Sequence, residues 1–302
     1  MTASGRAWTT PSASPSRCRT CSTCWNSPRN RSRPVPRWHE GLPASVCVRL
    51  TRRCNAACSF CQAPPTSRAE IRAADLGRMA RSFARHGVRS MKLSGGEPTV
   101  REDLPEIVAL IAAAGLKPVV ITNGITLSGA LLDACAAGGG EFKFSVHRPS
   151  SDNDLILRRR PFGHVRKNMA RVADRGAGLS VNSVVTPGTL SLMPELVEFS
   201  REAGAGKVSF IPVVARGRAR RKNEFCFSSA ELDSVIGRAG ELAALYRGRI
   251  VVRCIDFRSH DYWIVENDGS LWAETASEEA DRKICGREEL LMLDDVAVER
   301  GL

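Results

Sequence analysis

The sequence lacks any apolar run long enough to cross a bilayer, and its N-terminus lacks the apolar core of a signal peptide. These absences disfavour membrane and secreted classes, and we expect a cytoplasmic protein with no membrane partner. The sequence also lacks Gly-x-Gly-x-x-Gly and a Gly-Lys-Ser phosphate loop, which counts against the common nucleotide-binding folds. What remains is the composition of an ordinary globular protein.

Negative charge is scarce relative to positive charge, because 32 Asp and Glu face 44 Lys and Arg. Residues 1–40 hold half of the net charge of +12, with seven Arg against one Glu. Much of the remainder gathers in Arg158-Arg159-Arg160 and in the run 216–222. A solvated loop is one explanation of each run, and an anionic substrate or an acidic redox partner is the other. Nucleic acid is disfavoured, since no aromatic residues interleave with these charges.

Residues 1–40 are rich in Ser, Pro, Arg and Thr and show no sustained apolar periodicity, so we expect a disordered or loosely held segment. This segment contains Cys18, Cys21 and Cys24, whose spacing could hold a second cluster or a zinc ion. No fourth ligand lies close by, and a start codon assigned too far upstream is a rival explanation. The role of these three thiols therefore stays open.

The chain holds 11 cysteines, an odd number that favours metal ligation and free thiols over a disulfide framework. Cys54, Cys58 and Cys61 lie in one short loop directly after a strand-like run, 45–51. A cubane iron–sulfur cluster takes one ligand per iron, so three thiolates leave one iron open for chemistry. A zinc knot or three unrelated thiols is the alternative, although zinc usually takes its ligands as two Cys-x2-Cys pairs.

From residue 45 onward, strand-like and helix-like segments alternate regularly. The predicted strands cover 45–51, 88–93, 117–122, 141–147, 179–185 and 208–214. Each is followed by a helical pattern long enough for a crossover, so we expect parallel strands with helices outside. Six units are too few for the closed eight-fold barrel, and a partial (β/α)6 barrel over residues 45–246 fits better. A doubly wound sheet is the alternative.

Residues 249–302 change character. The ranges 250–256, 262–266 and 270–273 are strand-like, and Asn267-Asp268-Gly269 predicts a hairpin turn between the last two. We expect a small C-terminal β extension that caps the open side of the barrel.

Two motifs lie where a parallel α/β fold places its functional groups, at the carboxyl ends of strands. The cysteines follow the first predicted strand, and Ser94-Gly95-Gly96-Glu97-Pro98 follows the second. Together they resemble the radical S-adenosylmethionine (SAM) superfamily. The resemblance implies a [4Fe-4S] cluster on the three cysteines, SAM chelated to the open iron, reductive cleavage of SAM, and an electron donor of the flavodoxin or ferredoxin type.

The resemblance also implies a set of SAM contacts. Gly95, Gly96, Glu97 and Pro98 would hold the amino group of SAM, because two glycines allow a backbone to approach a ligand closely. Weaker candidates share positions at strand ends or beside the cysteines: Phe60, Asn123, Ser145, Asn182 and the backbone at 211–213. For each of these taken singly, a structural role is an equal alternative.

Two further residues are candidate catalytic groups. His147, at the end of the fourth predicted strand, could act as an acid or base, although a hydrogen-bonded structural role is favoured. Cys254 could donate a hydrogen atom to a substrate radical, and a buried structural thiol is the alternative. An auxiliary cluster is doubtful, because Ala273-Glu274 stands where the resemblance leads us to expect more cysteines.

For substrate we expect a small molecule of a specialised biosynthetic pathway, such as a sugar, aminocyclitol or nucleotide. Epimerisation, dehydration and oxidation are the outcomes considered, because the sequence shows no peptide-binding or second-cluster module. Peptide modification is the alternative within the same class of enzyme. A zinc-binding or nucleic-acid-binding protein is the non-enzymatic alternative.

Overall fold

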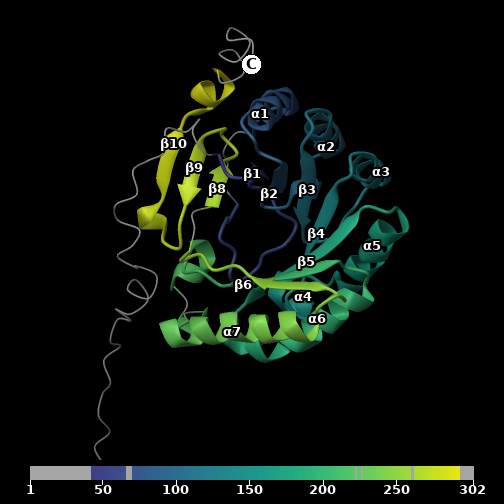
Figure 1. The fold of residues 1–302 in the computed structure, drawn as a ribbon, viewed down its shortest axis with the longest axis vertical. Coiled ribbons are helices and arrows are strands. Elements are labelled where there is room, and N and C mark those ends of the chain that lie inside the picture. The colour runs from purple at the N-terminus through teal and green to yellow at the C-terminus, as the bar shows by residue number, and fades with distance from the viewer. Residues whose placement is uncertain (1–41, 66–69, 222, 226, 260–261, 293–302) are drawn as a thin grey trace, which may run out of the picture.

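A single ten-stranded sheet organises the computed structural model, which describes residues 42–65, 70–221, 223–225, 227–259 and 262–292 (Figure 1). The strands occur in the spatial order β10-β9-β8-β1-β2-β3-β4-β5-β6-β7. Their bounds are β1 (Ser45–Thr51), β2 (Ser90–Gly95), β3 (Lys117–Thr122), β4 (Glu141–Ser145), β5 (Gly178–Val185), β6 (Lys207–Pro212), β7 (Val251–Cys254), β8 (Tyr262–Val265), β9 (Leu271–Glu274) and β10 (Arg282–Cys285).

Helices cover the outer face of the curved sheet (Figure 1). They are α1 (Ala73–Arg85), α2 (Leu104–Ala113), α3 (Gly129–Ala137), α4 (Asn153–Leu157), α5 (Phe162–Asp174), α6 (Met193–Glu202) and α7 (Ser229–Leu245). Each long helix buries one apolar stripe, as in α1, where Leu76, Met79 and Phe83 are fully buried. No helix of the described residues is long and apolar enough to cross a membrane.

Neighbouring strands from β1 to β7 all pair in parallel, which confirms the α/β partial barrel. The range 250–256 was assigned to the C-terminal extension from its sequence, yet its strand β7 pairs with β6. Among the described residues the run of parallel strands from β1 therefore continues to β7, one strand further than the sequence predicts. The sequence of a short strand does not reveal which strand it pairs with. The sequence pattern therefore predicted the strand β7 but not its pairing with β6.

The remaining strands extend the sheet at its β1 edge. β8 pairs in parallel with β1. β9 lies antiparallel between β8 and β10, and the turn at Gly269 connects β8 to β9. Buried ion pairs attach them: Arg49 bonds Glu274 and Glu266, and Arg52 bonds Glu266 at 2.7 Å. The antiparallel C-terminal strands thus continue the barrel wall.

Alternation along the strands separates an outer, helix-covered face from an inner, lumen face. In β1, Val46, Val48 and Leu50 are fully buried in the hydrophobic core, while Cys47 and Arg49 line the central cavity. The lumen is therefore polar at several positions where the outer face is uniformly apolar.

Candidate active site

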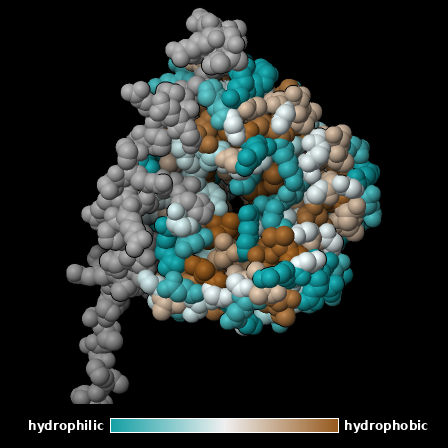
Figure 2. Space-filling model, in the orientation of Figure 1, coloured by the Kyte–Doolittle hydropathy of each residue, from teal (hydrophilic) through white to brown (hydrophobic). Residues whose placement is uncertain are grey.

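A cavity of about 290 Å³ occupies the lumen of the partial barrel. The centre of the molecule is hollowed in the space-filling view (Figure 2). Most of the residues predicted from sequence line it: Cys54, Cys58, Phe60, Cys61, Gly95, Gly96, Glu97, Asn123, Ser145, His147 and Asn182. Cys254 and Pro98 do not. The structure therefore gathers residues from five separate segments around one space.

The cysteine loop connects β1 to the helical layer and holds three free, partly exposed thiols. Its backbone is fixed by Ala57 N–H, which donates to Leu157 O at 3.0 Å, and by Arg218, which donates to Cys58 O at 3.2 Å. The donor set fits an iron–sulfur cluster, because it offers three thiolates to one cavity. No three Cys, His, Asp or Glu side chains of the described residues already converge as a metal site.

The Gly-Gly turn packs tightly against the segment that precedes Cys54. Gly96 N–H donates to Thr51 O at 2.7 Å, and Glu97 N–H donates to Arg53 O at 2.8 Å. A Cβ at Gly96 would lie 2.1 Å from Arg53 O, and Gly95 has a φ of +141°. The absence of a Cβ at Gly95 and Gly96 thus allows the turn to pack against the backbone of Thr51 and Arg53. With the Gly96 and Glu97 amides used, the turn is left with carbonyl oxygens to offer a ligand.

Glu97 connects this turn to the end of β3. Its buried carboxylate accepts hydrogen bonds from Thr122 Oγ1 and Asn123 N, both at 2.7 Å. Thr99 Oγ1 and N donate to it at 2.8 and 3.2 Å. Burial raises the pKa of the Glu97 carboxyl, and these four donors oppose that rise. Glu97 therefore positions two strand ends, since all of these partners are protein groups.

Asn123 closes the connection back to the cysteine loop. Its side-chain Nδ2 donates to Asn55 Oδ1 at 2.7 Å, and its Oδ1 accepts from Ile125 N at 3.0 Å. Asn55 directly follows Cys54. We call this set of hydrogen bonds, from Asn55 through Asn123 to Glu97 and the Gly-Gly turn, the motif network.

Ser145 and Asn182 are register partners on β4 and β5 and both line the cavity. His147, beyond the end of β4, is buried and accepts a hydrogen bond at Nδ1 from Val184 N at 3.0 Å. Burial lowers the pKa of His147 to about 3, so its ring is neutral near pH 7 and its hydrogen lies on Nε2. The Nδ1 atom of His147 is thus used in a hydrogen bond to the end of β5.

Phe60 forms an aromatic wall of the cavity beside His147. The two ring centroids are 4.9 Å apart in an edge-to-face arrangement at 88°. Ile211, on β6, lines the same cavity. Pro98 is buried as the first residue of a short 3₁₀ turn (Pro98–Val100) and does not line the cavity. Of the Gly95–Pro98 stretch, the proline is the member least placed to touch a ligand.

Cys254 faces away from the cavity. Its neighbours Arg253 and Ile255 line the lumen, whereas Cys254 packs against the hydrophobic core. Burial raises the pKa of its thiol to about 11. Cys47, on β1, lines the lumen in addition to the three thiols of the cysteine loop. Its position in β1, alternating with the buried Val46 and Val48, is the sequence signal for a lumen-facing thiol.

The basic run after β6 is largely structural. Arg216 is buried, bonds Asp281 and contributes an ion pair of 3.2 Å with Glu274. Arg220 pairs with Glu278 and Glu279 on the surface. The anionic partners of Arg216 and Arg220 are therefore in the C-terminal strands and turns of the same chain. The predictions for residues 1–40, including Cys18, Cys21 and Cys24, lie outside the described residues.

Comparisons with known proteins identify the family of the chain. The model of the Radical SAM superfamily matches residues 48–205. A PqqA peptide cyclase of Ruegeria pomeroyi is 31% identical over 228 residues, which cover 73% of this chain and 60% of the relative. A probable GTP 3′,8-cyclase of Methanopyrus kandleri is 35% identical over 160 residues, covering 51% of this chain and 52% of the relative. The chain thus spans about half to three fifths of the length of these curated relatives.

A solved structure shares the fold. SuiB of Streptococcus suis, bound to its precursor peptide SuiA, superposes with a TM-score of 0.67 at 17% identity, covering 78% of this chain and 60% of that one. SuiB has also been solved with SAM bound. The predicted family and its enzymatic class are both confirmed. The family match covers the cysteine loop, the Gly-Gly turn and strands β2 to β5, and the chain belongs to the radical SAM superfamily of iron–sulfur, SAM-binding enzymes.

Proposed function

We propose that this enzyme binds a [4Fe-4S] cluster through Cys54, Cys58 and Cys61, binds SAM beside the Gly95–Pro98 turn, and modifies a peptide. The observation that carries the cofactor assignment is the motif network, which ties the cysteine loop, the Gly-Gly turn and the end of β3 around one cavity. When bound, the cluster supplies one electron for cleavage of SAM to a 5′-deoxyadenosyl radical.

Different residues of the chain would bind different parts of SAM. Carbonyl oxygens of Gly95 and Gly96 would accept hydrogen bonds from its ammonium group, because the neighbouring amides already bond Thr51 and Arg53. Ser145 and Asn182 offer a hydroxyl and an amide to its carboxylate or ribose. Phe60 and Ile211 provide apolar surface for the adenine. The enclosing barrel would keep water from the radical.

The comparisons favour a peptide substrate over the small molecule expected from sequence. The R. pomeroyi relative is named for a peptide substrate and matches 73% of the chain, whereas the GTP 3′,8-cyclase match covers 51%. A structural neighbour was solved with a peptide bound. A nucleotide remains the second candidate because of the GTP 3′,8-cyclase relative.

An electron donor of the flavodoxin or ferredoxin type would dock beside the cysteine loop. Arg158, Arg159 and Arg160 are exposed there, and Arg159 Nε donates to Asn55 O at 3.0 Å. Exposed positive charge next to the loop would attract the acidic surface that such donors carry.

The test is anaerobic reconstitution with iron and sulfide, followed by dithionite and SAM, with 5′-deoxyadenosine measured by chromatography. We expect cluster absorbance and the nucleoside in wild-type protein, and neither in Cys58→Ala. Cys135→Ala is the matched control, because that free cysteine is buried in α3 outside the cavity lining. Zinc uptake without cluster absorbance or SAM cleavage would contradict the proposal.

Substrate class is tested in the same assay. Short peptides, GTP and simple sugars are added in turn, and the rise in 5′-deoxyadenosine above the substrate-free rate is measured. We expect stimulation by peptides. Stimulation by GTP or sugars alone would restore the small-molecule assignment.

A further inference from the structure

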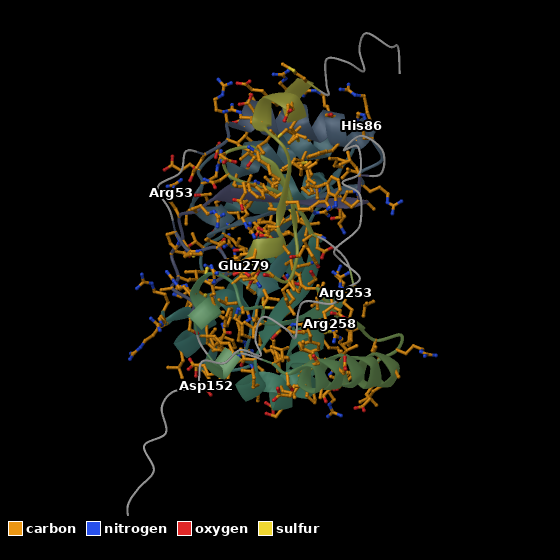
Figure 3. All side chains as sticks on the ribbon, turned by 90° about the vertical axis from the view of Figure 1, so that its left-hand side faces the viewer. Arg53, His86, Asp152, Arg253, Arg258 and Glu279 are labelled. Carbon is orange, nitrogen blue, oxygen red and sulfur yellow. The ribbon has the colours of Figure 1, made fainter. Side chains whose placement is uncertain are left out.

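Three cations line the cavity below the motif network: Lys92 on β2, Lys143 on β4 and Arg253 on β7. We call them the lumen cation cluster. Lys92 and Lys143 each lie two residues before a serine that lines the cavity, Ser94 and Ser145. Two residues along a strand correspond to about 7 Å, so these lysines lie one layer deeper toward the amino ends of the strands. In Figure 3, Arg253 lies on the side of the molecule opposite Arg53 and Asp152, which follow β1 and β4.

The carboxylates near the lumen cation cluster are committed to other partners. Glu141 accepts a hydrogen bond from Ser180 at 2.5 Å and pairs with Lys117 at 3.0 Å and Lys207 at 3.3 Å. Its distance to Lys143 Nζ is 4.0 Å, the limit of an ion pair. Glu274, which lines the cavity, bonds Arg49 and pairs with Arg216. Both acids therefore leave the cluster with excess positive charge.

The three cations make few compensating contacts of their own. Within the described residues neither Lys92 nor Arg253 forms an ion pair; Lys92 Nζ lies 5.9 Å from the centroid of the Tyr262 ring, and Arg253 Nε donates to Ser209 Oγ at 2.9 Å. The Lys143 side chain is 5% exposed. Of the three cations, Lys143 is buried, Lys92 is half-buried and Arg253 is exposed. A buried charge without a close partner costs free energy, so this cost falls on Lys143, and folding alone gains nothing from it.

The pKa of Lys143 reflects this cost of burying its charge. Burial lowers its pKa to about 7, Glu141 opposes the fall, and the charges of Lys207, Arg253 and Lys92 add to it. A bound anion would reverse the effect of those three cations. The cluster thus has the form of a binding site prepared for negative charge inside an otherwise largely apolar chamber.

We propose that the lumen cation cluster is the anion subsite of the substrate chamber, and that it binds a carboxylate of the peptide, either an acidic side chain or the chain end. This assignment rests on the proposed function, which makes the lumen the substrate chamber. Anchoring a carboxylate here would hold the neighbouring carbon atoms of the peptide between the cluster and the SAM-binding layer. The cations would thereby select the residue that meets the radical.

A carboxylate fits better than a phosphate. Phosphate sites are commonly built on helix N-termini or glycine-rich loops, whose backbone amides surround the oxygens. The lumen cation cluster consists of side chains from three strands, and the helices lie outside the sheet. Point charges from lysine with one guanidinium suit a single carboxylate.

The experiment measures binding of small probes to SAM-free protein by ligand-observed NMR. Acetyl-Glu-amide is compared with its uncharged isostere acetyl-Gln-amide, and acetyl-Ala with a free carboxylate is compared with acetyl-Ala-amide. Inorganic phosphate is the fifth probe. The variant is Lys143→Met, which removes the charge and keeps the length, and Lys167→Met, on the exposed face of α5, is the matched control. Thermal unfolding checks that each variant is folded.

We expect a charged carboxylate probe to bind wild type and Lys167→Met alike, and its dissociation constant to rise roughly tenfold or more in Lys143→Met. The acetyl-Glu-amide and acetyl-Ala arms tell a side-chain carboxylate from a chain end. Equal binding of charged and uncharged isosteres, unchanged binding in Lys143→Met, or binding of phosphate alone would overturn the proposal. Because the probes need no SAM cleavage, repeating the titration in Cys58→Ala separates this result from failure of the proposed function.

Discussion

The two ends of the lumen differ in how their polar groups are satisfied. In the motif network Glu97 accepts four hydrogen bonds from protein groups, and Asn123 Nδ2 donates to Asn55 Oδ1. In the lumen cation cluster positive charges exceed the carboxylates available to them. A satisfied network is rigid and holds a cofactor that is always the same, whereas an unsatisfied cluster gains its missing partner from the ligand. The comparison predicts opposite mutational behaviour at the two ends.

The largest expected effect is that of Gly96→Ala. The new Cβ would meet Arg53 O at 2.1 Å, so the turn and the backbone next to Cys54 would have to separate. We expect the free energy of unfolding to fall by about 2–4 kcal/mol and SAM cleavage to be lost. Urea denaturation and the 5′-deoxyadenosine assay measure the two effects. Gly237→Ala, in α7 with no atom within 4 Å of the added Cβ, should instead be neutral or stabilising by up to about 1 kcal/mol.

Glu97→Gln should weaken the motif network without adding volume. The amide would turn one of its two acceptor groups into a donor that faces Thr122 Oγ1 or Asn123 N–H. We expect a loss of about 1–3 kcal/mol in the free energy of unfolding and weaker binding of SAM, measured by denaturation and by calorimetry. Glu106→Gln, on the exposed face of α2, provides the control. An unfolding free energy equal to that of the control would contradict the role assigned to Glu97.

Lys143→Met should act in the opposite direction and increase stability. The folded pKa near 7 lies below the unfolded value of about 10.4, so burial of charged Lys143 destabilises the protein fully below pH 7. That penalty fades as the pH rises from about 7 toward 10. We expect the variant to be more stable by about 1–3 kcal/mol at pH 6 and by much less at pH 10. Glu141, Lys207, Arg253 and Lys92 face the same region, and Glu141, with a pKa of about 2, stays ionised throughout.

Urea denaturation at both pH values measures this difference, with Lys167→Met as the control that should show neither shift. A variant that is less stable than wild type at pH 6 would indicate that Lys143 is a structural partner of Glu141. The proposed asymmetry between the two ends of the lumen would then be lost.

The smallest expected effect is that of Cys254→Ser. Because this thiol packs against the core, whereas Cys47 lines the lumen, we expect the product formed per 5′-deoxyadenosine to stay within about twofold of wild type. Mass spectrometry of the product in D₂O measures it. A fall confined to Cys254→Ser would support the hydrogen-donor role considered from sequence, and a fall confined to Cys47→Ser would place such a role on β1.

Sequence patterns predicted the regular elements well where they are long. The predicted strands 45–51 and 117–122 have the bounds of β1 and β3. The short elements α4 and β10 were not predicted, since four or five residues carry little periodicity. The strand at 250–256 was found, but its pairing with β6 was not, because pairing is a long-range choice among edges.

The sequence by itself determined the family and the cofactor motifs, because the spacing of Cys54, Cys58 and Cys61 and the Gly-Gly turn are local features of contiguous residues. Only the tertiary structure decided which side chains meet across strands. In the folded partial barrel, Cys254 packs against the hydrophobic core, and buried His147 accepts a hydrogen bond from Val184 N. It also gathered Lys92, Lys143 and Arg253, more than 40 residues apart in sequence, in one lumen. These charged side chains become neighbours because their strands belong to one sheet, and strand pairing cannot be predicted from a local sequence pattern.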